Sequence, residues 1–403
     1  MESIKLICIT FFIYLIKTYR YFFPTANKVF ILPPASAGSL GDEALLAGLL
    51  SLLKKQGRDQ HVYQAILPHW DPLDTPDTPL NTITISSADT QSTLAFIWKL
   101  RQCEHFYVLG ADVMDGKYST DLVAQITQFC NIAAETSVPC TILGFSFSQS
   151  PSPVAINSLK RLSNDVCCKC RDKKSLERFK LFTHHPAQLV ADLAFNMQPQ
   201  IKTPNAATCQ DWITKQKSSG KQVIAFNINK LITQDVPEDI AKLYADELMQ
   251  LMKQNSEIAC VFLPHDLRPQ QSDYDFLKQL INHLPEEIIQ RTTLLPPPFH
   301  AWDLKALTSQ TDLVISGRMH LTIAALAQGV PAIGITYQGK FEGLFNYFNL
   351  ENLLFDPAKL LKHGALSQHI TQTLKQIINH KESVIENQSH VVALSAENIK
   401  PFK

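Results

Sequence analysis

The sequence predicts an α/β protein of two doubly wound, Rossmann-like domains that face a cleft, followed by a C-terminal helical tail. Three observations predict this fold class. The chain has 403 residues, which is long for one hydrophobic core and sufficient for two. Apolar runs typical of strands alternate with runs of helical period, a pattern that builds parallel sheets with helices on both faces. The alternation weakens between Asn196 and Gly220 and then begins again, which indicates a linker.

The individual elements follow from these runs in chain order. In the first domain we expect strands at 28–34, 105–112, 140–148 and 165–170, and helices at 42–57 and 120–137. In the second we expect strands at 221–229, 258–266, 311–317 and 330–337, a helix at 237–254, and a tail helix at 366–381. The predicted parts are an apolar N-terminal helix at 1–24, domains at 25–197 and 221–358, a linker at 198–220 and C-terminal helices at 359–403.

The charge balance argues against one class of partner. Lys and Arg together number 37, as do Asp and Glu, so the net charge is zero when histidines are neutral. Nucleic-acid binding needs a clustered basic surface, and we therefore expect no nucleic-acid partner. An anionic small molecule needs only two or three local arginines. The nine cysteines form no disulfide framework, which indicates a reducing compartment.

Three cysteines lie close together at Cys167, Cys168 and Cys170, with His184 and His185 downstream. Their spacing matches none of the common zinc patterns. We favour a buried strand that uses cysteine as a small apolar residue, with a zinc site as the alternative. We therefore expect no metal.

Residues 6–16, LICITFFIYLI, form a strongly apolar run near the N-terminus. The run is too short to span a bilayer core, which needs roughly 20 residues, and no small-residue cleavage site of a signal peptide follows it. The basic and aromatic residues that come next fit a helix lying in a membrane interface, so that residues 4–23 would make a peripheral membrane contact. A helix packed on the protein's own surface explains the run equally well.

The segment DLVISGRMHLTIAALAQGVPAIGITYQGK, residues 312–340, joins a strand to a helix and then to a second strand. Arg318 and His320 fall at the carboxyl end of the first strand and in the first turn of the helix. Because a helix N-terminus is partly positive and arginine binds phosphate or carboxylate through paired donors, this turn is a candidate anion site. His320 would then move a proton on the bound anion. Alternatively, Arg318 pairs with a neighbouring carboxylate and His320 is a core histidine.

The same segment resembles the signature of the polysaccharide pyruvyl transferase family. Two further segments are similar to motifs of that family: GSLGDEALLAGLL at 38–50, and CRDKKSLERF at 170–179 followed by ADLAF at 191–195. The family is understood as a two-domain fold of the GT-B type. Its members transfer the enolpyruvyl skeleton of phosphoenolpyruvate to sugar hydroxyls, usually as a pyruvate ketal. The sequence departs from the family pattern at Ser39, where asparagine is common, and in the strand ending near residue 148.

The resemblance implies a role for each matching residue. Arg318 would bind the phosphate or carboxylate of phosphoenolpyruvate, and His320 would protonate its methylene carbon. Arg171, from the other domain, would hold the second anionic group. Ser39 and Gly41 would lie on the acceptor side, which is the N-terminal domain. This chemistry requires no metal and no cofactor, because phosphoenolpyruvate is itself the donor substrate.

Three other residues are weaker candidates. Asp42 would bind sugar hydroxyls or act as a base on the acceptor side, or else cap its helix. His265 follows a strand of the second domain and would help to bind the donor if it lines the cleft, or else belongs to a polar loop. Lys340 follows the last strand of the signature and would meet an anion of the donor, although a solvated lysine explains it as well.

We predict an enzyme that transfers pyruvate from phosphoenolpyruvate to a sugar of a cell-surface polysaccharide or its lipid-linked precursor, forming a ketal. One alternative is a GT-B glycosyltransferase, although no acidic residue of the second domain is clearly placed for the ribose of a nucleotide sugar. The other is a non-catalytic homologue that binds a glycan or a metabolite. We expect the protein in the cytoplasm or peripherally on the cytoplasmic face of the membrane.

Overall fold

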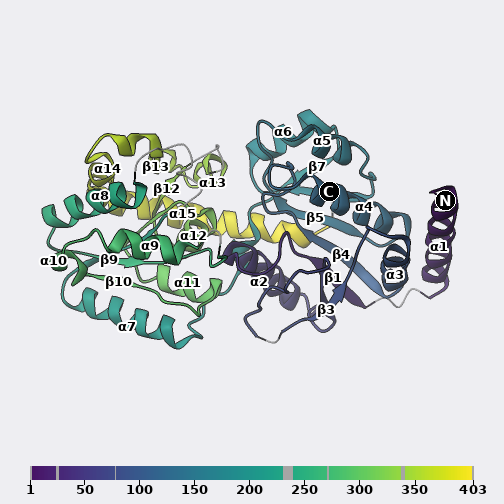
Figure 1. Ribbon diagram of the computed structural model, residues 1–403, viewed down its shortest axis with the longest axis horizontal. Helices are drawn as coiled ribbons and strands as arrows, with labels where there is room; N and C mark the ends of the chain where they lie inside the picture. The colour runs from purple at the N-terminus through teal and green to yellow at the C-terminus, as the bar shows by residue number, and fades with distance from the viewer. Residues whose placement is uncertain are drawn as a thin grey trace. The chain divides into compact units, whose positions relative to one another are not determined.

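The structure is a computed structural model that describes residues 2–23, 27–77, 79–229, 239–269, 272–336 and 341–401, with side chains from residue 7 onward. The chain divides into two compact units. Unit 1 comprises Met1–Ala37, Leu45–Asn196 and Leu394–Lys403, and unit 2 comprises Gly38–Ala44 and Met197–Ala393. In Figure 1 each unit has helices around its own sheet.

Unit 1 is built on a seven-stranded parallel sheet of order β3-β2-β1-β4-β5-β6-β7. Its strands are β1 Lys28–Leu32, β2 Val62–Ile66, β3 Asn81–Thr84, β4 Cys103–Leu109, β5 Cys140–Phe145, β6 Val166–Cys170 and β7 Ala187–Leu189. Its helices are α1 Glu2–Phe22, most of α2 Leu40–Lys55, α3 Thr90–Leu100, α4 Thr120–Glu135, α5 Pro153–Lys160, α6 Lys173–Thr183, η1 Leu193–Asn196 and η5 Glu397–Ile399.

Both faces of this sheet are buried, which explains why its strands are apolar runs rather than alternating ones. Successive side chains of a strand point to opposite faces. On β1, Phe30 and Leu32 belong to one core cluster, together with residues of α3 and α4. Val29 and Ile31 belong to a second cluster, together with residues of α2. A parallel sheet covered on both faces is the expected result of βαβ alternation.

Unit 2 repeats this plan with a six-stranded parallel sheet of order β10-β9-β8-β11-β12-β13. Its strands are β8 Gln222–Asn227, β9 Ile258–Phe262, β10 Thr292–Leu294, β11 Leu313–Ser316, β12 Ala332–Ile335 and β13 Leu354–Phe355. Its helices are α7 Pro204–Ser218, α8 Ile240–Gln254, α9 Asp273–Ile281, α10 Glu286–Ile289, α11 Ala301–Thr308, α12 Met319–Leu326, α13 Glu342–Asn346, η3 Glu351–Leu353, η4 Pro357–Leu361, α14 Ala365–Lys375 and most of α15 Ile377–Ala396.

The strand orders fix where a ligand site is expected. In each unit the first three strands are added side by side toward one edge of the sheet. The chain then crosses back to the first strand, and the remaining strands are added toward the opposite edge. The reversal falls between β1 and β4 in unit 1, and between β8 and β11 in unit 2. In doubly wound sheets ligands bind at such a reversal, outside the carboxyl ends of the strands. In unit 2 the carboxyl ends of β8, β9 and β11 therefore mark the expected place.

The predicted fold class of two doubly wound units with C-terminal helices is confirmed, and the structure differs from two local predictions. The predicted linker at 198–220 contains α7, which the sequence pattern hides because only Ala206, Cys209 and Ile213 of this helix are buried. The predicted tail helix at 366–381 is broken at Gln376 into α14 and α15. The described part of the chain contains no helix long and apolar enough to cross a membrane.

The end of the chain is fastened to unit 1 by buried polar contacts. Asn398 accepts a hydrogen bond from the Gly144 amide (2.9 Å) and donates one to the Ala191 carbonyl (2.8 Å). The ammonium group of Lys169, a fully buried residue of β6, donates to the carbonyls of Glu397 and Lys400, each at 2.6 Å. Burial lowers the pKa of Lys169 to about 8. These bonds explain why the chain returns to unit 1 at Leu394.

Replacing Asn398 by alanine should destabilise unit 1, because the buried Gly144 amide and Ala191 carbonyl would lose their partner. We expect the free energy of unfolding to fall by about 2–4 kcal/mol, measured by urea denaturation followed by circular dichroism. His390→Ala, which replaces an exposed side chain of α15, is the control. Equal stability of the two variants would show that Asn398 does not fasten the chain.

Candidate functional site

Polar residues gather where three neighbouring strands of unit 2 end. Asn227 is the last residue of β8, and Ser316 is the last residue of β11. His265 and Asp266 follow β9, and Arg318 is the N-cap residue of α12. Because carboxyl ends of parallel strands meet at one edge, the fold alone brings these residues together. The hydroxyl of Ser316 donates to the Asn227 side chain (3.2 Å) and accepts from the Arg318 amide (2.9 Å).

Arg318 is held by two buried carboxyl groups. Its Nη2 lies 2.7 Å from Oδ1 of Asp273, and its Nε donates to the same group at 3.1–3.2 Å. Its Nη1 lies 3.2 Å from Oδ2 of Asp266. The sequence-based alternative, in which Arg318 pairs with a neighbouring carboxylate, therefore describes the observed contacts. The pairing with Asp273 has the paired-donor geometry that gives arginine its directional binding.

Asp273 is the residue on which the loops of the site converge. This first residue of α9 is fully buried. Its Oδ2 accepts hydrogen bonds from the Asn227 side chain (3.0 Å) and from the backbone amides of His265 (3.0 Å) and Asp266 (3.1 Å). Burial raises the pKa of Asp273 although Arg318 opposes the change. Sequence reasoning missed this residue, because nothing in SDYD distinguishes it from a helix cap.

The two candidate histidines stack in this cluster. The rings of His265 and His320 are nearly parallel, at 8°, with centroids 6.4 Å apart. His265 is buried, whereas His320, in the first turn of α12, is half-buried. Burial, with His320 and Arg318 nearby, lowers the pKa of His265 well below its ordinary value. His265 is therefore neutral at physiological pH.

The glycine-rich turn at 38–41 packs against these same residues. Ser39 forms a β-bridge with Asp266, and the Leu40 amide donates to the His265 carbonyl at 3.3 Å. A Cβ atom on Gly41 would lie 2.4 Å from Nδ1 of His320, so only glycine leaves room for the ring. Likewise, Gly38 (φ +114°) lies against the side chain of Arg268. The loops of the site thus meet this turn closely.

These contacts correct the predicted place of the acceptor-side residues. Ser39, Gly41 and Asp42 were expected in the N-terminal domain, but the structure counts Gly38–Ala44 with unit 2. The physical reason is the close packing of the turn on His265, Asp266 and His320. Asp42 itself is half-buried in the first turn of α2.

Glu43, the residue after Asp42, binds the N-terminus of α11 in unit 2. Its Oε2 accepts a hydrogen bond from the Ala301 amide (2.6 Å) at the N-terminus of α11. Its Oε1 lies 2.8 Å from Nδ1 of His300, whose ring stacks on Trp302 with centroids 4.5 Å apart. A carboxylate at a helix N-terminus is favourable. The glutamate of the Gly-Asp-Glu motif therefore supports the site's scaffold.

Arg171 lies in unit 1, just after β6, and is buried in an ion pair. Its Nη1 is 3.0 Å from Oδ2 of Asp192, and its Nε donates to the Ser146 hydroxyl at 2.6 Å. The next residue, Asp172, caps α6 by accepting from the Ser175 amide at 2.8 Å. The two motif segments at 170–179 and 191–195 are thus joined by one ion pair. The neighbouring Cys167–Cys170 segment forms β6, in agreement with the predicted strand.

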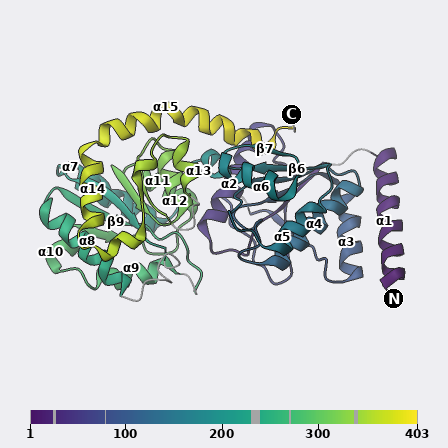
Figure 2. The same ribbon diagram turned by 90° about the horizontal axis from the view of Figure 1, so that it is seen from above.

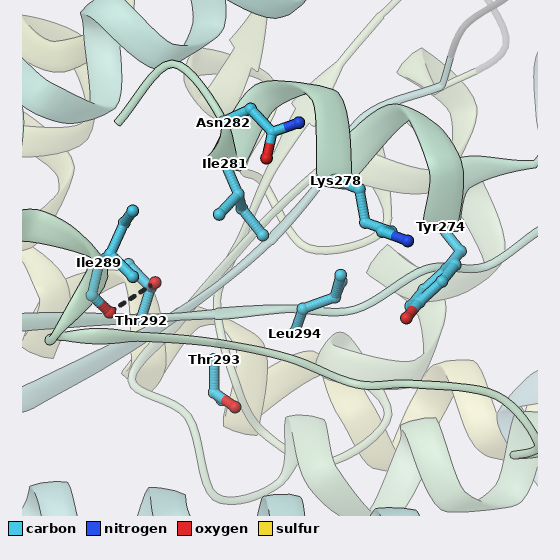
Figure 3. Close-up of a pocket in the computed structure, with 8 residues that line it drawn as sticks. All are labelled: Tyr274, Lys278, Ile281, Asn282, Ile289, Thr292, Thr293 and Leu294. Carbon is cyan, nitrogen blue, oxygen red and sulfur yellow. Dashed lines mark hydrogen bonds between the residues drawn. The ribbon is translucent and has the colours of Figure 1, made fainter. Parts of the chain in front are cut away.

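The described pocket lies away from the polar cluster, and one candidate residue cannot be placed. Lys340 is outside the described residues. A pocket of about 320 Å³ in unit 2 lies between α9 and β10 and is lined by none of the predicted site residues. Figure 3 shows Tyr274, Lys278 and Ile281 on one side of it and Leu294 on the other. The pocket shares only α9 with the polar cluster.

The chain has two Rossmann-like units, and in each the strand order of the parallel sheet reverses once. Together with the polar residues at the reversal in unit 2, this arrangement defines a GT-B fold. The chain belongs to the polysaccharide pyruvyl transferase family, whose model matches residues 40–339. The matched range includes Gly41, Arg171, His265, Arg318 and His320. The family is one of transferases, and it implies a glycan as acceptor. No curated protein matches the chain in sequence.

Solved structures support the fold. UGT2 of Phytolacca americana, complexed with UDP-2-fluoro-glucose and pterostilbene, superposes with a TM-score of 0.56 at 12% identity, covering 93% of this chain and 96% of its own. The UDP-bound MnaA of S. aureus gives 0.55 at 11% identity, covering 92% and 94%. The UDP-GlcNAc 2-epimerase of Neisseria meningitidis bound to UDP-GlcNAc gives 0.53 at 13%, covering 91% and 97%. At these identities the likeness concerns the fold alone.

A double-mutant cycle should test the contact between Gly41 and His320. We expect Gly41→Ala to lower the free energy of unfolding by about 1–3 kcal/mol, as overpacking does, because the new methyl group overlaps the imidazole. In a His320→Ala background the same change should cost much less, since the ring is gone. Urea denaturation of the four proteins measures the coupling. Equal costs in both backgrounds would contradict the contact.

The lowered pKa of His265 predicts a loss of stability in acid. As the pH falls through about 6.5, the unfolded chain binds a proton at this residue but the folded chain does not. Stability is therefore present above pH 6.5 and is lost below it, by at most about 2 kcal/mol between pH 7 and pH 5 for this residue. His265→Gln should lose correspondingly less stability over this interval in urea titrations. His390→Gln, at an exposed histidine, should behave like the parent protein.

Proposed function

We propose that this protein transfers the pyruvyl group of phosphoenolpyruvate to hydroxyl groups of a glycan and forms a pyruvate ketal. One observation carries the proposal. The glycine-rich turn at 38–41, the loop at 265–268 and the Arg318-x-His320 turn, two of them family motifs, pack together at the sheet reversal of unit 2. That edge is where a doubly wound sheet binds its ligand.

The chemistry needs a proton donor and a means of stabilising charge. Protonation of the methylene carbon of phosphoenolpyruvate creates an oxocarbenium-like centre at C2, which a sugar hydroxyl attacks while losing its proton. The C2–O bond to phosphate then breaks and inorganic phosphate leaves. A second hydroxyl attacks C2 and closes the ketal, and its proton passes to the departing phosphate. We assign the first proton transfer to His320, because it is the half-buried histidine of the cluster. His265, buried and neutral, would orient rather than protonate.

The ion pairs of Arg318 suggest how the arginine would receive an anion. Its contact with Asp273 is short and paired, whereas its contact with Asp266 is a single 3.2 Å approach. Asp266 also accepts a hydrogen bond from Nε of Arg268 at 2.9 Å. A phosphate or carboxylate could therefore replace Asp266 at Arg318 while Asp266 keeps Arg268. Asp273 would hold the guanidinium in place throughout.

The role of Arg171 as a second anion-binding residue remains part of this proposal. Its pairing with Asp192 fixes the guanidinium in one orientation, as Asp273 does for Arg318. The acceptor would be a sugar of a cell-surface polysaccharide or of its lipid-linked precursor. The family match supports the coarser part of this assignment, a glycan acceptor.

Binding and turnover should separate the roles of the two motif residues. In isothermal titration at a temperature where all variants are folded by circular dichroism, we expect Arg318→Ala to weaken phosphoenolpyruvate binding at least tenfold. Lys278→Ala, which removes an exposed cation of the same unit, should leave it unchanged. His320→Gln should retain binding but lose about 10²–10⁴-fold in acceptor-dependent phosphate release.

Titrations with UDP- and GDP-sugars distinguish the rival enzyme class. If a nucleotide sugar binds and phosphoenolpyruvate does not, the protein is a glycosyltransferase and the proposal is wrong. If phosphoenolpyruvate binds equally well to Arg318→Ala, the donor site lies elsewhere.

A further inference from the structure

Helix α1 has one face that packs on unit 1. The side chains of Ile9, Phe12, Ile13 and Ile16 contact the unit 1 core, and Ile16 is only 1% exposed. These positions recur at helical spacing, so they lie along one side of the helix. Figures 1 and 2 both show α1 beside α3, the helix with which it has its main contacts.

Arg20 fixes the end of this helix in place. Its Nη1 donates to the carbonyls of Cys103 (2.6 Å) and Leu100 (3.0 Å), and its Nη2 donates to the carbonyl of Ser137 (3.3 Å). The ring of Phe12 also lies 6.3 Å from that of Trp98 on α3. The helix is therefore docked by its inner face, as the packed alternative of the sequence analysis requires.

The opposite face of α1 is also apolar, yet it is exposed. Its large side chains are strongly exposed, with Phe11 at 65%, Tyr14 at 68% and Tyr21 at 82%. The exposed apolar positions of the helix include Ile7, Phe11, Tyr14, Leu15, Tyr21 and Phe22. A soluble surface helix normally carries charged residues on its outer face. A contiguous apolar surface of this kind marks a contact with another molecule or with a membrane.

The charges around this face favour lipid as the occupant. Residues 7–23 contain no Asp or Glu, whereas they contain Lys17, whose ammonium is exposed, and Arg20, whose guanidinium is taken up by the carbonyls of unit 1. On the adjoining α3 side, Arg101 lies over the Trp98 ring at 4.0 Å, and Trp98 is itself 46% exposed. Basic and aromatic side chains beside an apolar helix face are the features that bind an anionic membrane interface.

A protein partner fits this face less well. Protein interfaces carry about one hydrogen bond per 100–200 Å² of buried area. Among the exposed side chains of α1 the polar groups are few: the hydroxyls of Thr10, Tyr14, Tyr19 and Tyr21, the thiol of Cys8 and the ammonium of Lys17. Tyrosine and tryptophan prefer the boundary between headgroups and acyl chains, where the ring is apolar and the tip is wet.

We propose that the outer face of α1 binds an anionic lipid surface, with the helix lying along that surface while its inner face stays docked on unit 1. The helix does not cross the bilayer, because no helix within the described residues is long and apolar enough to do so. This inference does not depend on the reaction proposed above, since it rests on a helix remote in sequence from the residues of the polar cluster.

Flotation with lipid vesicles tests this proposal. The full chain is mixed with vesicles of phosphatidylcholine and phosphatidylglycerol at 3:1, and separately with pure phosphatidylcholine. We expect it to float with the anionic vesicles, and more weakly with the neutral ones. The variant Ile7→Gln/Phe11→Gln/Tyr14→Gln should lose at least tenfold in binding. The control Val154→Gln/Leu181→Gln/Ile378→Gln replaces three exposed apolar residues outside α1 and should bind like the parent.

Three results would overturn the proposal. The parent chain fails to float with either vesicle, or the α1 variant floats as well as the control. The third result is that neither protein floats, while light scattering finds a dimer for the parent and a monomer for the α1 variant. A second copy of the chain, and not lipid, would then cover the outer face of α1. Because all six replaced side chains are exposed, the variants should fold, which circular dichroism verifies.

Discussion

The polar edge of unit 2 depends on one buried carboxyl group. Asp273 binds the guanidinium of Arg318, the amide of Asn227 and two backbone amides of the loop after β9. The end of β8, the loop after β9 and the start of α12 therefore share one acceptor. A buried ion pair is costly to desolvate and stabilises only when its remaining hydrogen-bonding capacity is filled, which is the arrangement found here. Its effect is to give the arginine one orientation, which is what the binding of a small dianion requires.

The sequence predicted the parts of this structure that follow from repeated local patterns. The apolar runs that became β1, β4, β5, β8, β9, β11 and β12 were visible because they are buried on both faces. The short edge strands and α7 were not predicted, because an edge strand or a polar helix buries few side chains and leaves little periodicity. The placement of Arg318 at a strand-to-helix turn was predictable for the same local reason.

The partners of these residues could not be predicted. Nothing near Arg318 in the sequence indicates Asp273, which lies 45 residues earlier and meets it only because β9 and β11 lie on either side of β8. The turn at 38–41 was assigned to the first domain by its position in the chain, whereas its contacts with His265 and His320 place it in unit 2. For α1, the sequence showed an apolar helix but could not separate its docked face from its exposed one. Long-range packing decides all three cases.

The close approach of Gly41 to His320 also bears on how relatives of this protein should be compared. The ring of His320 fills the space in which a Cβ atom of residue 41 would lie. A larger residue at position 41 is therefore compatible only with a smaller or displaced side chain at position 320. A substitution at one of the two positions should therefore be tolerated only together with a matching change at the other. If related sequences all keep glycine at position 41, the contact with the imidazole at position 320 explains it. That glycine would then carry no information about which sugar is bound.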